Sequence, residues 1–300
     1  MGWQHDPLVY TSIAAGLVAA FCWGTADYMS RSQSEKVGYY RTVIYSHVVT
    51  LIVILVLVPL VSPDLVLPVF PLVALAAAGA FNFVAFIFLY RAFHTGVVSV
   101  VAPVAYTYPA VTTVLSIGIL GTVLSSVRIL AIAGIILGVV LLSTRFSELS
   151  KSFTSRSGMT AGVGSAIGSS VSFGTVYIAI GYAAPLVSVV VPVMVLRAMG
   201  IVAGLALAPL LHQDVRPSRL TFSRTMIGMG VLETAGFLSF TYGISVGGGS
   251  LPIVAAISGM GGAVAASYGL YFLKERLEPN QAAGVLLSLL GVFTLLYLGG

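Results

Sequence analysis

Three ionisable side chains lie inside long apolar stretches of this 300-residue sequence, and they are its strongest candidates for chemistry. Glu233 lies in the segment VLETAGF, and Arg197 lies within another apolar stretch. Asp27 follows Trp23 by one helical turn, so both side chains are expected on one helix face. A charge in the middle of a membrane-spanning helix costs about 2.5–3.5 kcal/mol on insertion scales, so each of these residues needs a reason to be there.

Each carboxylate has a functional and a structural interpretation. Glu233 could bind a cation or carry a proton, because burial disfavours the charged form of a carboxylate that has no partner. It could instead pair with Arg197 and serve only to stabilise the fold. Asp27 could contact a bound molecule, or it could form an ion pair with Arg31, one turn further along. The sequence leaves both alternatives open, and we predict Glu233 as the residue for proton or cation coupling.

Aromatic and amide side chains recur at helical spacing near these charges. Asn82, Phe86 and Tyr90 share one face at positions i, i+4 and i+8. Aromatic faces beside a carboxylate favour organic cations or zwitterions, although any single ring could equally be a packing residue. The predicted substrate-binding residues are Trp23, Asp27, Asn82, Phe86, Tyr90, Tyr106, Tyr108, Phe173, Tyr177 and Tyr242.

A stretch of about 25 residues without charge, from Val97 to Gly121, is long enough to span a bilayer and contains two prolines. Pro103 and Pro109 each remove a backbone donor, so we predict a helix kinked at both positions. Freed carbonyl groups are tolerated in a membrane only beside protein, hydroxyl groups or cavity water. We therefore expect this helix to line a polar cavity and Pro103 and Pro109 to act in gating; a kinked packing helix is the alternative.

The composition places the chain among membrane proteins with several spans, because 58% of residues are hydrophobic, 8% are charged and the mean hydropathy is +1.05. The lipid bilayer is therefore an expected partner, and nucleic acid is not, because Lys and Arg exceed Asp and Glu by only 14 to 9. One cysteine, and no histidine pair at ligand spacing, argue against a metal site, and no cofactor is expected. The pattern G-x-S-x-G at residues 243–247 ends a membrane helix, so we expect no enzyme.

Hydropathy predicts ten spans in two halves. Residues 1–144 form the first five-helix repeat, residues 145–158 a polar linker, and residues 159–300 the second repeat. Trp23-Gly24-Thr25 in the first span corresponds to Phe173-Gly174-Thr175 in the sixth, and an odd number of spans per repeat inverts the second half. The expected fold is an all-α integral membrane fold of ten transmembrane helices in two inverted five-helix repeats. The predicted spans are residues 10–30, 40–61, 70–91, 97–121, 127–144, 159–181, 187–211, 224–243, 250–273 and 280–298.

Three segments carry a family resemblance: Trp23-Gly24, VSVVAPVAYTYPAVT from Val98 to Thr112, and FLKERLEPNQAAGVLLSLLGVFTLL from Phe272 to Leu296. With them the chain resembles the EamA-like family of the drug/metabolite transporter superfamily. The resemblance implies ten helices and alternating access. The second repeat has Gly261-Gly262 opposite Pro109, so we expect the two halves to contribute unequally to gating.

The positive charges predict an orientation in the cell membrane. Twelve of the 14 Lys and Arg residues lie at odd-numbered connections, and Arg128 alone lies at an even one. The positive-inside rule then places the odd connections in the cytoplasm and both termini outside, whereas the family resemblance suggests termini inside. Arg41 and His47 are expected at the membrane interface.

The expected function is secondary active transport of small polar organic metabolites, amino acids or amines, by alternating access. Export and coupling to protons are compatible with this function. Uptake of a cationic osmolyte or choline-like amine, or a passive metabolite channel, are the alternatives. Both a monomer and a homodimer remain open.

Overall fold

A computed structural model describes residues 7–61, 68–95, 103–147, 149, 162–246, 250–273 and 278–298, and all regular elements in these ranges are helices. The elements are α1 (Pro7–Val37), α2 (Tyr39–Val61), α3 (Val69–Thr95), α5 (Tyr108–Leu120), α6 (Ser126–Ser143), α9 (Val163–Ala183), α10 (Val190–Leu210), the 3-10 helix η1 (Arg219–Phe222), α11 (Arg224–Ser245), α12 (Ser250–Ser258), α13 (Gly261–Leu273) and α14 (Pro279–Leu298). The polar linker predicted at residues 145–158 lies largely outside the described residues, as does the start of the predicted fourth span at 97–102.

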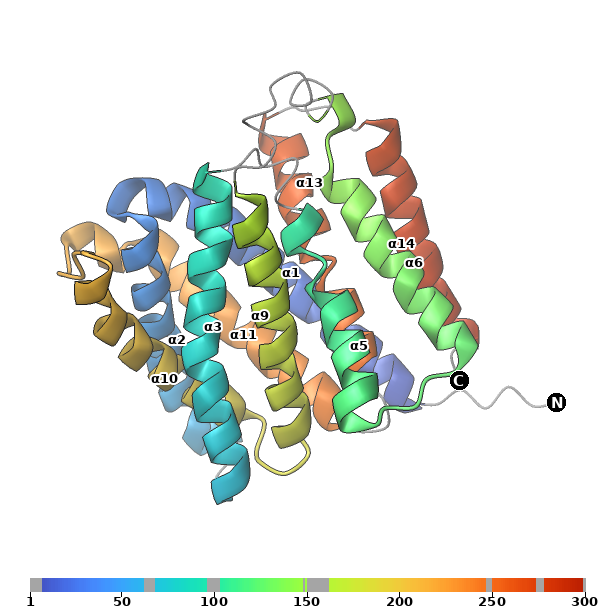
Figure 1. The fold of residues 1–300 in the computed structure, drawn as a ribbon, viewed down its shortest axis with the longest axis horizontal. Coiled ribbons are helices and arrows are strands. Elements are labelled where there is room, and N and C mark those ends of the chain that lie inside the picture. The colour runs from blue at the N-terminus through green and yellow to red at the C-terminus, as the bar shows by residue number, and fades with distance from the viewer. Residues whose placement is uncertain are drawn as a thin grey trace.

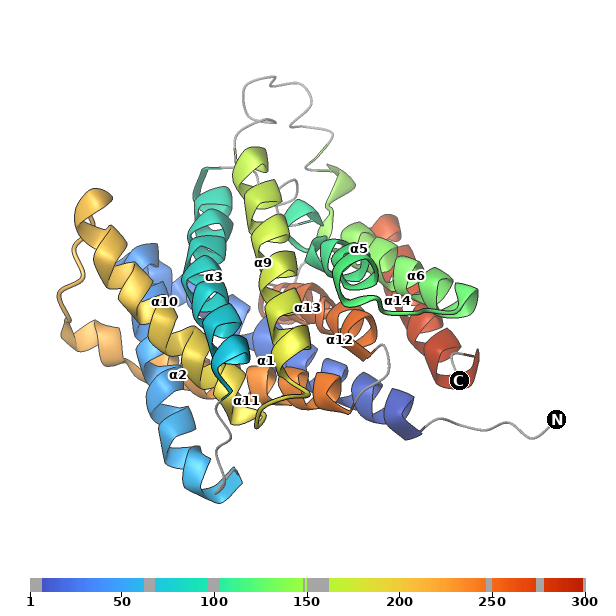
Figure 2. The ribbon, with the colours of Figure 1, turned by 60° about the horizontal axis from the view of Figure 1, so that its bottom comes forward.

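The helices form two inverted halves of five spans. In Figure 1, α1 begins and α14 ends at the same end of the bundle, whereas α6 ends and α9 begins at the opposite end. The second view keeps the same neighbours together, with α1 and α11 side by side and α6 beside α14 (Figure 2). The predicted architecture of ten membrane helices in two inverted repeats is confirmed.

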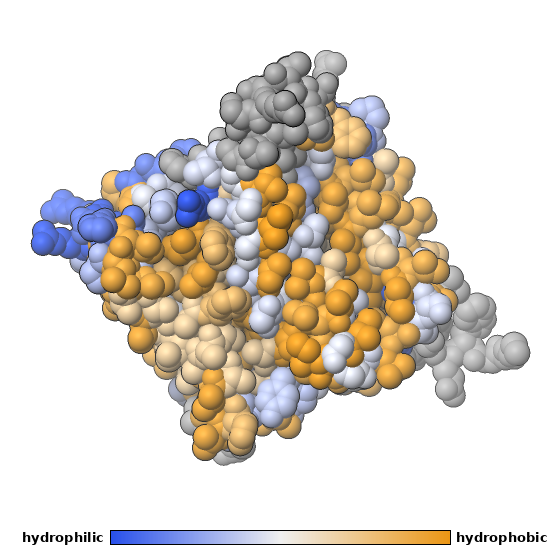
Figure 3. Space-filling model, in the orientation of Figure 1, coloured by the Kyte–Doolittle hydropathy of each residue, from blue (hydrophilic) through white to orange (hydrophobic). Residues whose placement is uncertain are grey.

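Within the described residues, eight helices are long and apolar enough to cross a membrane. The two remaining spans are α11, which carries Glu233 in its middle, and the pair α12 and α13, each too short to cross alone. Figure 3 shows an apolar surface across the middle of the bundle, with hydrophilic residues gathered where α10 ends and α11 begins. This surface suits lipid, as the composition predicts.

The first helix is longer than predicted. It continues to Val37, because the polar segment after residue 30 contains good helix formers such as Glu35 and Lys36. Gly38 ends it with φ +84°, a conformation that glycine adopts without strain, and α2 begins at the next residue. The charges of residues 31–36 therefore extend α1 beyond the apolar span and do not form a loop.

The predicted proline-kinked helix is instead two helical pieces. Residues 103–105 are helical, Tyr106 and Thr107 form a turn, and α5 begins at Tyr108 with Pro109 in its first turn. A proline there is compatible with a regular helix, because the amide groups of the first turn have no partner within the helix. The span is therefore interrupted in the turn just before Pro109 and not bent within one continuous helix, and a gating role of Pro103 and Pro109 stays a prediction.

The second half has a matching break without a proline. The predicted ninth span divides at Gly259-Met260, between α12 and α13. The two breaks face one another: the hydroxyl oxygens of Tyr108 and Ser258 lie 3.3 Å apart, and a Cβ added to Gly259 would lie 2.8 Å from Pro109 Cγ. The interrupted helices of the two repeats thus meet inside the protein, where protein atoms replace the missing helical hydrogen bonds.

Helices α6 and α14 form a tightly packed pair at the edge of the bundle (Figure 1). A Cβ added to Gly138 would lie 2.7 Å from the Gly284 carbonyl oxygen. At the end of the pair next to the linker, Asn280 donates hydrogen bonds to the carbonyl groups of Leu141 and Thr144. There, outside the span, a hydrogen bond from the Ser147 hydroxyl lowers the pKa of the Glu278 carboxyl group. Small residues let two membrane helices approach closely.

We predict that Gly138→Ala destabilises this pair, because the new methyl group meets backbone atoms of Gly284 and Ser288 at under 3 Å. Overpacking of this kind costs about 1–3 kcal/mol. The apparent melting temperature of the purified protein should fall. Gly134→Ala is the matched control, because beyond its own helix backbone the described residues place only Leu287 Cδ1 within 4 Å of the new Cβ, at 3.9 Å. Equal melting temperatures for the two variants would contradict the packing described here.

Candidate functional site

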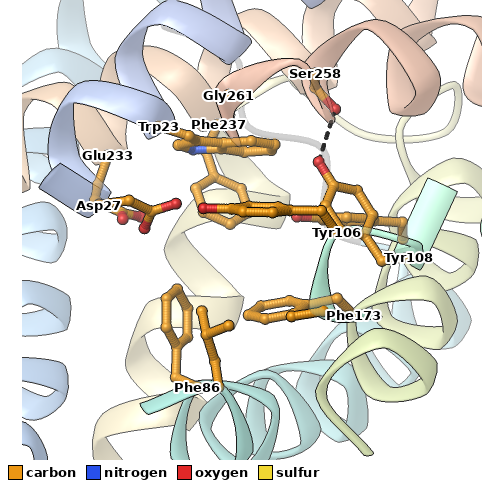
Figure 4. Close-up of a pocket in the computed structure, with 13 residues that line it drawn as sticks. Trp23, Asp27, Phe86, Tyr106, Tyr108, Phe173, Glu233, Phe237, Ser258 and Gly261 are labelled. Atoms are coloured by element: carbon orange, nitrogen blue, oxygen red, sulfur yellow. Dashed lines mark hydrogen bonds between the residues drawn. The ribbon is translucent and has the colours of Figure 1, made fainter. Parts of the chain in front are cut away.

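A pocket lies where the broken helices of the two repeats meet (Figure 4). Helices α1, α3, α5, α9, α11, α12 and α13 and the turn before α5 contribute its wall. The lining residues are Trp23, Asp27, Phe86, Leu89, Ala105, Tyr106, Tyr108, Phe173, Tyr177, Glu233, Phe237, Ser258 and Gly261.

Most of the wall consists of aromatic rings that pack edge to face or stack. The Trp23 ring lies 4.8 Å from Phe237 and 6.0 Å from Tyr177, measured between ring centroids. Phe173 lies 5.1 Å from Phe86, nearly perpendicular to it. These distances match those of favourable aromatic pairs, which fix the rings with few rotamers to lose. The pocket therefore has a stiff apolar frame before any ligand enters.

Two carboxyl groups interrupt the aromatic wall on the same side of the pocket (Figure 4). Asp27 comes from α1 and Glu233 from α11, and these two helices pack against each other along their length. The hydroxyl group of Tyr106, from the break before α5, points toward Asp27 (Figure 4). The pocket thus presents acidic groups at one side and aromatic faces elsewhere.

Glu233 has the cationic partner that the structural alternative required. Its Oε2 lies 2.6 Å from Nη2 of Arg197, and both side chains are buried. Close charge-assisted hydrogen bonds of this kind are the strong ones. The premise that Glu233 lacks a partner is therefore wrong, although its carboxyl group still borders the pocket.

The first repeat holds Arg197 from the other side. Arg197 Nη1 lies 3.0 Å from Nε2 of His47 and 3.4 Å from Oδ1 of Asn82, and both partners are fully buried. Its guanidinium group also lies over the ring of Phe237, 4.3 Å from the centroid. The expectation that His47 is interfacial is wrong, because this face of α2 packs against α10 and not against lipid.

Arg41, by contrast, reaches the surface. Its guanidinium group pairs with Asp214 beyond the end of α10. A hydrogen bond from the backbone N–H of Arg216, together with Arg41, lowers the pKa of the Asp214 carboxyl group. This pair ties the start of α2 to the connection after α10, outside the apolar part of the bundle.

Most of the predicted substrate-binding residues come together in the pocket, and three do not line it. Asn82 lies one layer behind the wall, in contact with Arg197, and Tyr90 stacks behind Phe86 at 6.1 Å. Tyr242 is 53% exposed, so its prediction is wrong. It lies nine positions after Glu233 on α11, which turns it by about 180° to the opposite face of the helix.

Phe237, Ser258 and Gly261 also line the pocket, although they are not among the predicted site residues. Phe237 follows Glu233 by four residues, so the same spacing argument that grouped Asn82 with Phe86 would have found it. Ser258 and Gly261 flank the break between α12 and α13. Their small size favoured packing as an interpretation, and no sequence signal located the break.

In the part of the chain that the structure describes, no group of three His, Cys, Asp or Glu side chains is placed to hold a metal ion. The two carboxyl groups instead border a pocket lined by aromatic rings and tyrosine hydroxyl groups, and Glu233 pairs with Arg197 behind the wall. Such a site offers negative charge and cation–π contacts to a small organic molecule.

Comparison with known proteins agrees with this architecture. The profile of the EamA-like transporter family matches residues 11–144 and, separately, residues 160–297. No curated protein matches the chain in sequence. One solved structure, described only as the crystal structure of a protein, shares the fold with a TM-score of 0.74 and 16% sequence identity, over 97% of this chain and 98% of the other. Because the family profile matches both halves and nearly the whole length, the chain belongs to the EamA-like transporter family.

Proposed function

We propose that the protein is a secondary active transporter that carries small organic metabolites with an amino group, amino acids or amines, by alternating access. The observation that carries this proposal is the pocket, in which carboxyl groups lie among aromatic rings where the two inverted repeats meet. Transporters built from inverted repeats bind substrate between the repeats, at helices that are interrupted there. The breaks at Tyr106-Thr107 and Gly259-Met260 fit this pattern.

Asp27 is the residue we assign to the amino group of the substrate. Arg197 already pairs with Glu233, whereas no cationic side chain pairs with Asp27 among the side chains that the structure describes; that of Arg31 lies outside them. Trp23 and Tyr177 supply aromatic surface on the same pocket wall. An ammonium group gains both a charge-assisted hydrogen bond and cation–π contacts in such a site.

Close packing on the side of the termini supports a carrier over a passive channel. A Cβ added to Gly243 would lie 2.6 Å from Ala15 Cβ, and one added to Gly181 would lie 2.5 Å from Leu251 Cδ2. The hydroxyl of Ser12 also donates a hydrogen bond to the Gly243 carbonyl. Helices α1, α9, α11 and α12 thus leave no space between these residues, and transport past them requires the helices to move.

Reconstituted protein separates the candidate functions. If the protein is a carrier, proteoliposomes loaded with unlabelled amine should take up labelled amine faster than empty ones, by counterflow. The initial rate of uptake should also saturate with amine concentration. A passive channel should do neither. A choline-like amine has no N–H group to donate to Asp27, so it should compete poorly with a primary amine. Strong competition by choline would favour the alternative of osmolyte uptake.

Coupling to protons is part of the proposal, but we assign it to Asp27 and not to Glu233, which the sequence pointed to. Glu233 already has a cationic partner, so we assign the competition between proton and substrate to Asp27. A proton and an ammonium group cannot both neutralise one carboxylate, which makes their binding mutually exclusive. An imposed pH gradient should then drive substrate accumulation in proteoliposomes.

Replacing Asp27 by Asn should weaken amine binding roughly 10- to 100-fold, because a hydrogen bond to a charged group contributes about 1.5–3 kcal/mol. The change keeps the shape of the side chain and removes its negative charge. Isothermal titration with purified protein measures the effect. Asp214→Asn is the matched control, since it makes the same chemical change at the surface. Equal amine affinity in both variants would remove Asp27 from the site.

Replacing Pro109 by Ala should lower transport while the protein still folds. The variant regains an N–H donor in the first turn of α5, directly after the break, so the helix can continue through the break. Pro209→Ala is the control, because Pro209 lies near the end of α10, away from the pocket. Normal counterflow by the Pro109 variant would show that the break does not depend on this residue.

We propose that the end of the bundle carrying the basic connections faces the cytoplasm, with both termini outside. In a Cys22→Ala background, cysteines at exposed Val123 and Pro217 report on opposite ends of the bundle. An impermeant thiol reagent applied to intact cells should label Val123→Cys, and it should label Pro217→Cys only after permeabilisation. The reverse pattern would support the orientation suggested by the family resemblance.

A further inference from the structure

The buried contacts of Arg197 affect the pocket although Arg197 does not line it. One nitrogen of its guanidinium group, Nη2, lies 2.6 Å from Glu233, which does line the pocket. The other, Nη1, lies near His47 and Asn82 of the first repeat. Asn82 is uncharged, and so is His47 when its imidazole is unprotonated. Arg197 is 1% exposed, so little water screens its charge. Its strong electrostatic partner is therefore Glu233.

The charges near the pocket can then be counted. Arg197 and Glu233 cancel each other, and an ionised Asp27 contributes one negative charge. The other polar groups that line the pocket in the described part of the chain are hydroxyl groups of tyrosine and serine, and the Trp23 indole. The pocket and its immediate surroundings thus carry about one net negative charge, which a single ammonium group neutralises.

A buried ion pair of this kind is weak evidence for a role in stability. Replacing a buried ion pair by apolar residues of similar volume is often neutral or stabilising, whereas removing one partner is strongly destabilising. A pair kept beside a binding pocket therefore calls for a role besides stability. Two carboxyl groups in one pocket would favour two cationic groups, and the guanidinium group removes one of the two negative charges.

We propose that Arg197 determines which substrate charge the pocket accepts. By neutralising Glu233 it leaves a pocket that selects molecules with one net positive charge at the amino end and rejects diamines. Arg197 acts as a positioning residue, through Glu233, and does not contact the substrate. This inference rests on the proposed function, because it takes Asp27 as the partner of an amino group.

The proposal predicts the net charge of the pocket in four forms of the full-length protein. Wild type and the double variant Arg197→Met/Glu233→Gln both keep about one negative charge, contributed by Asp27. Glu233→Gln leaves Arg197 unbalanced and brings the pocket near zero. Arg197→Met leaves two carboxyl groups and brings it to about two negative charges. Each step is one charge, and none of the four forms substitutes an aromatic residue of the pocket.

Titration calorimetry with purified protein detects these differences in charge through the affinities of three aromatic probes. The probes are phenethylamine, the uncharged phenethyl alcohol, and the dication para-xylylenediamine. Glu233→Gln should lower the affinity ratio of phenethylamine to phenethyl alcohol by about tenfold or more. Arg197→Met should raise the affinity ratio of the diamine to phenethylamine by a similar factor. The double variant should return both ratios toward wild type.

A purely structural role predicts a different result. Loss of folding or of packing would lower the binding of all three probes together and leave both ratios unchanged, and that outcome would overturn the proposal. A double variant that keeps the ratios of Glu233→Gln would overturn it as well. The two single variants shift the charge in opposite directions, so if one does not fold, the other, compared with the double variant, decides.

Failure of the proposed function is distinguishable from failure of this inference. If wild-type protein binds phenethylamine no better than phenethyl alcohol, Asp27 is not an amine site and the proposed function fails. If wild type prefers the amine but the affinity ratios of the variants do not change as predicted, the function stands and the role of Arg197 is refuted.

Discussion

The bilayer offers no hydrogen bonds and little screening of charge, and the organisation of this protein follows from that constraint. A helix break or a buried charge is tolerated only where other parts of the protein compensate for it. Both breaks lie in the interior, where Tyr108 of one repeat faces Ser258 of the other. Both buried charges of the Arg197–Glu233 pair face each other between α10 and α11. The pocket forms where these compensated features come together.

The two repeats solve the same structural problem with different residues. The first interrupts its fourth helix at Tyr106-Thr107 and starts the next piece with Pro109 in its first turn. The second interrupts the corresponding helix at Gly259-Met260, where small residues allow the close approach of Pro109. The first repeat contributes the uncharged Asn82 where the second contributes Glu233. The acidic side of the pocket combines Asp27 of the first repeat with Glu233 of the second.

The aromatic frame and the charges have separate tasks in the proposed mechanism. The rings around Trp23 and Phe173 hold one another at favourable distances and exclude water, which strengthens any electrostatic interaction inside. The carboxyl group of Asp27 is the group we propose to orient the substrate. Arg197 adjusts the net charge from behind the wall. Movement of the repeats would change access to this site without requiring the site itself to be rebuilt.

The sequence by itself determined the membrane fold, because apolar length and composition are local properties that a bilayer constrains tightly. It also put Trp23 and Asp27 on one helix face, since helical spacing puts residues three or four apart on one face, and both line the pocket. Only the tertiary structure decided which face of each helix points inward. That choice placed Tyr242 outside the pocket, put His47 in the protein interior, and brought Glu233 into contact with Arg197, 36 residues away. It also decided where the helices break, because a break in lipid depends on neighbours that lie far away in the sequence.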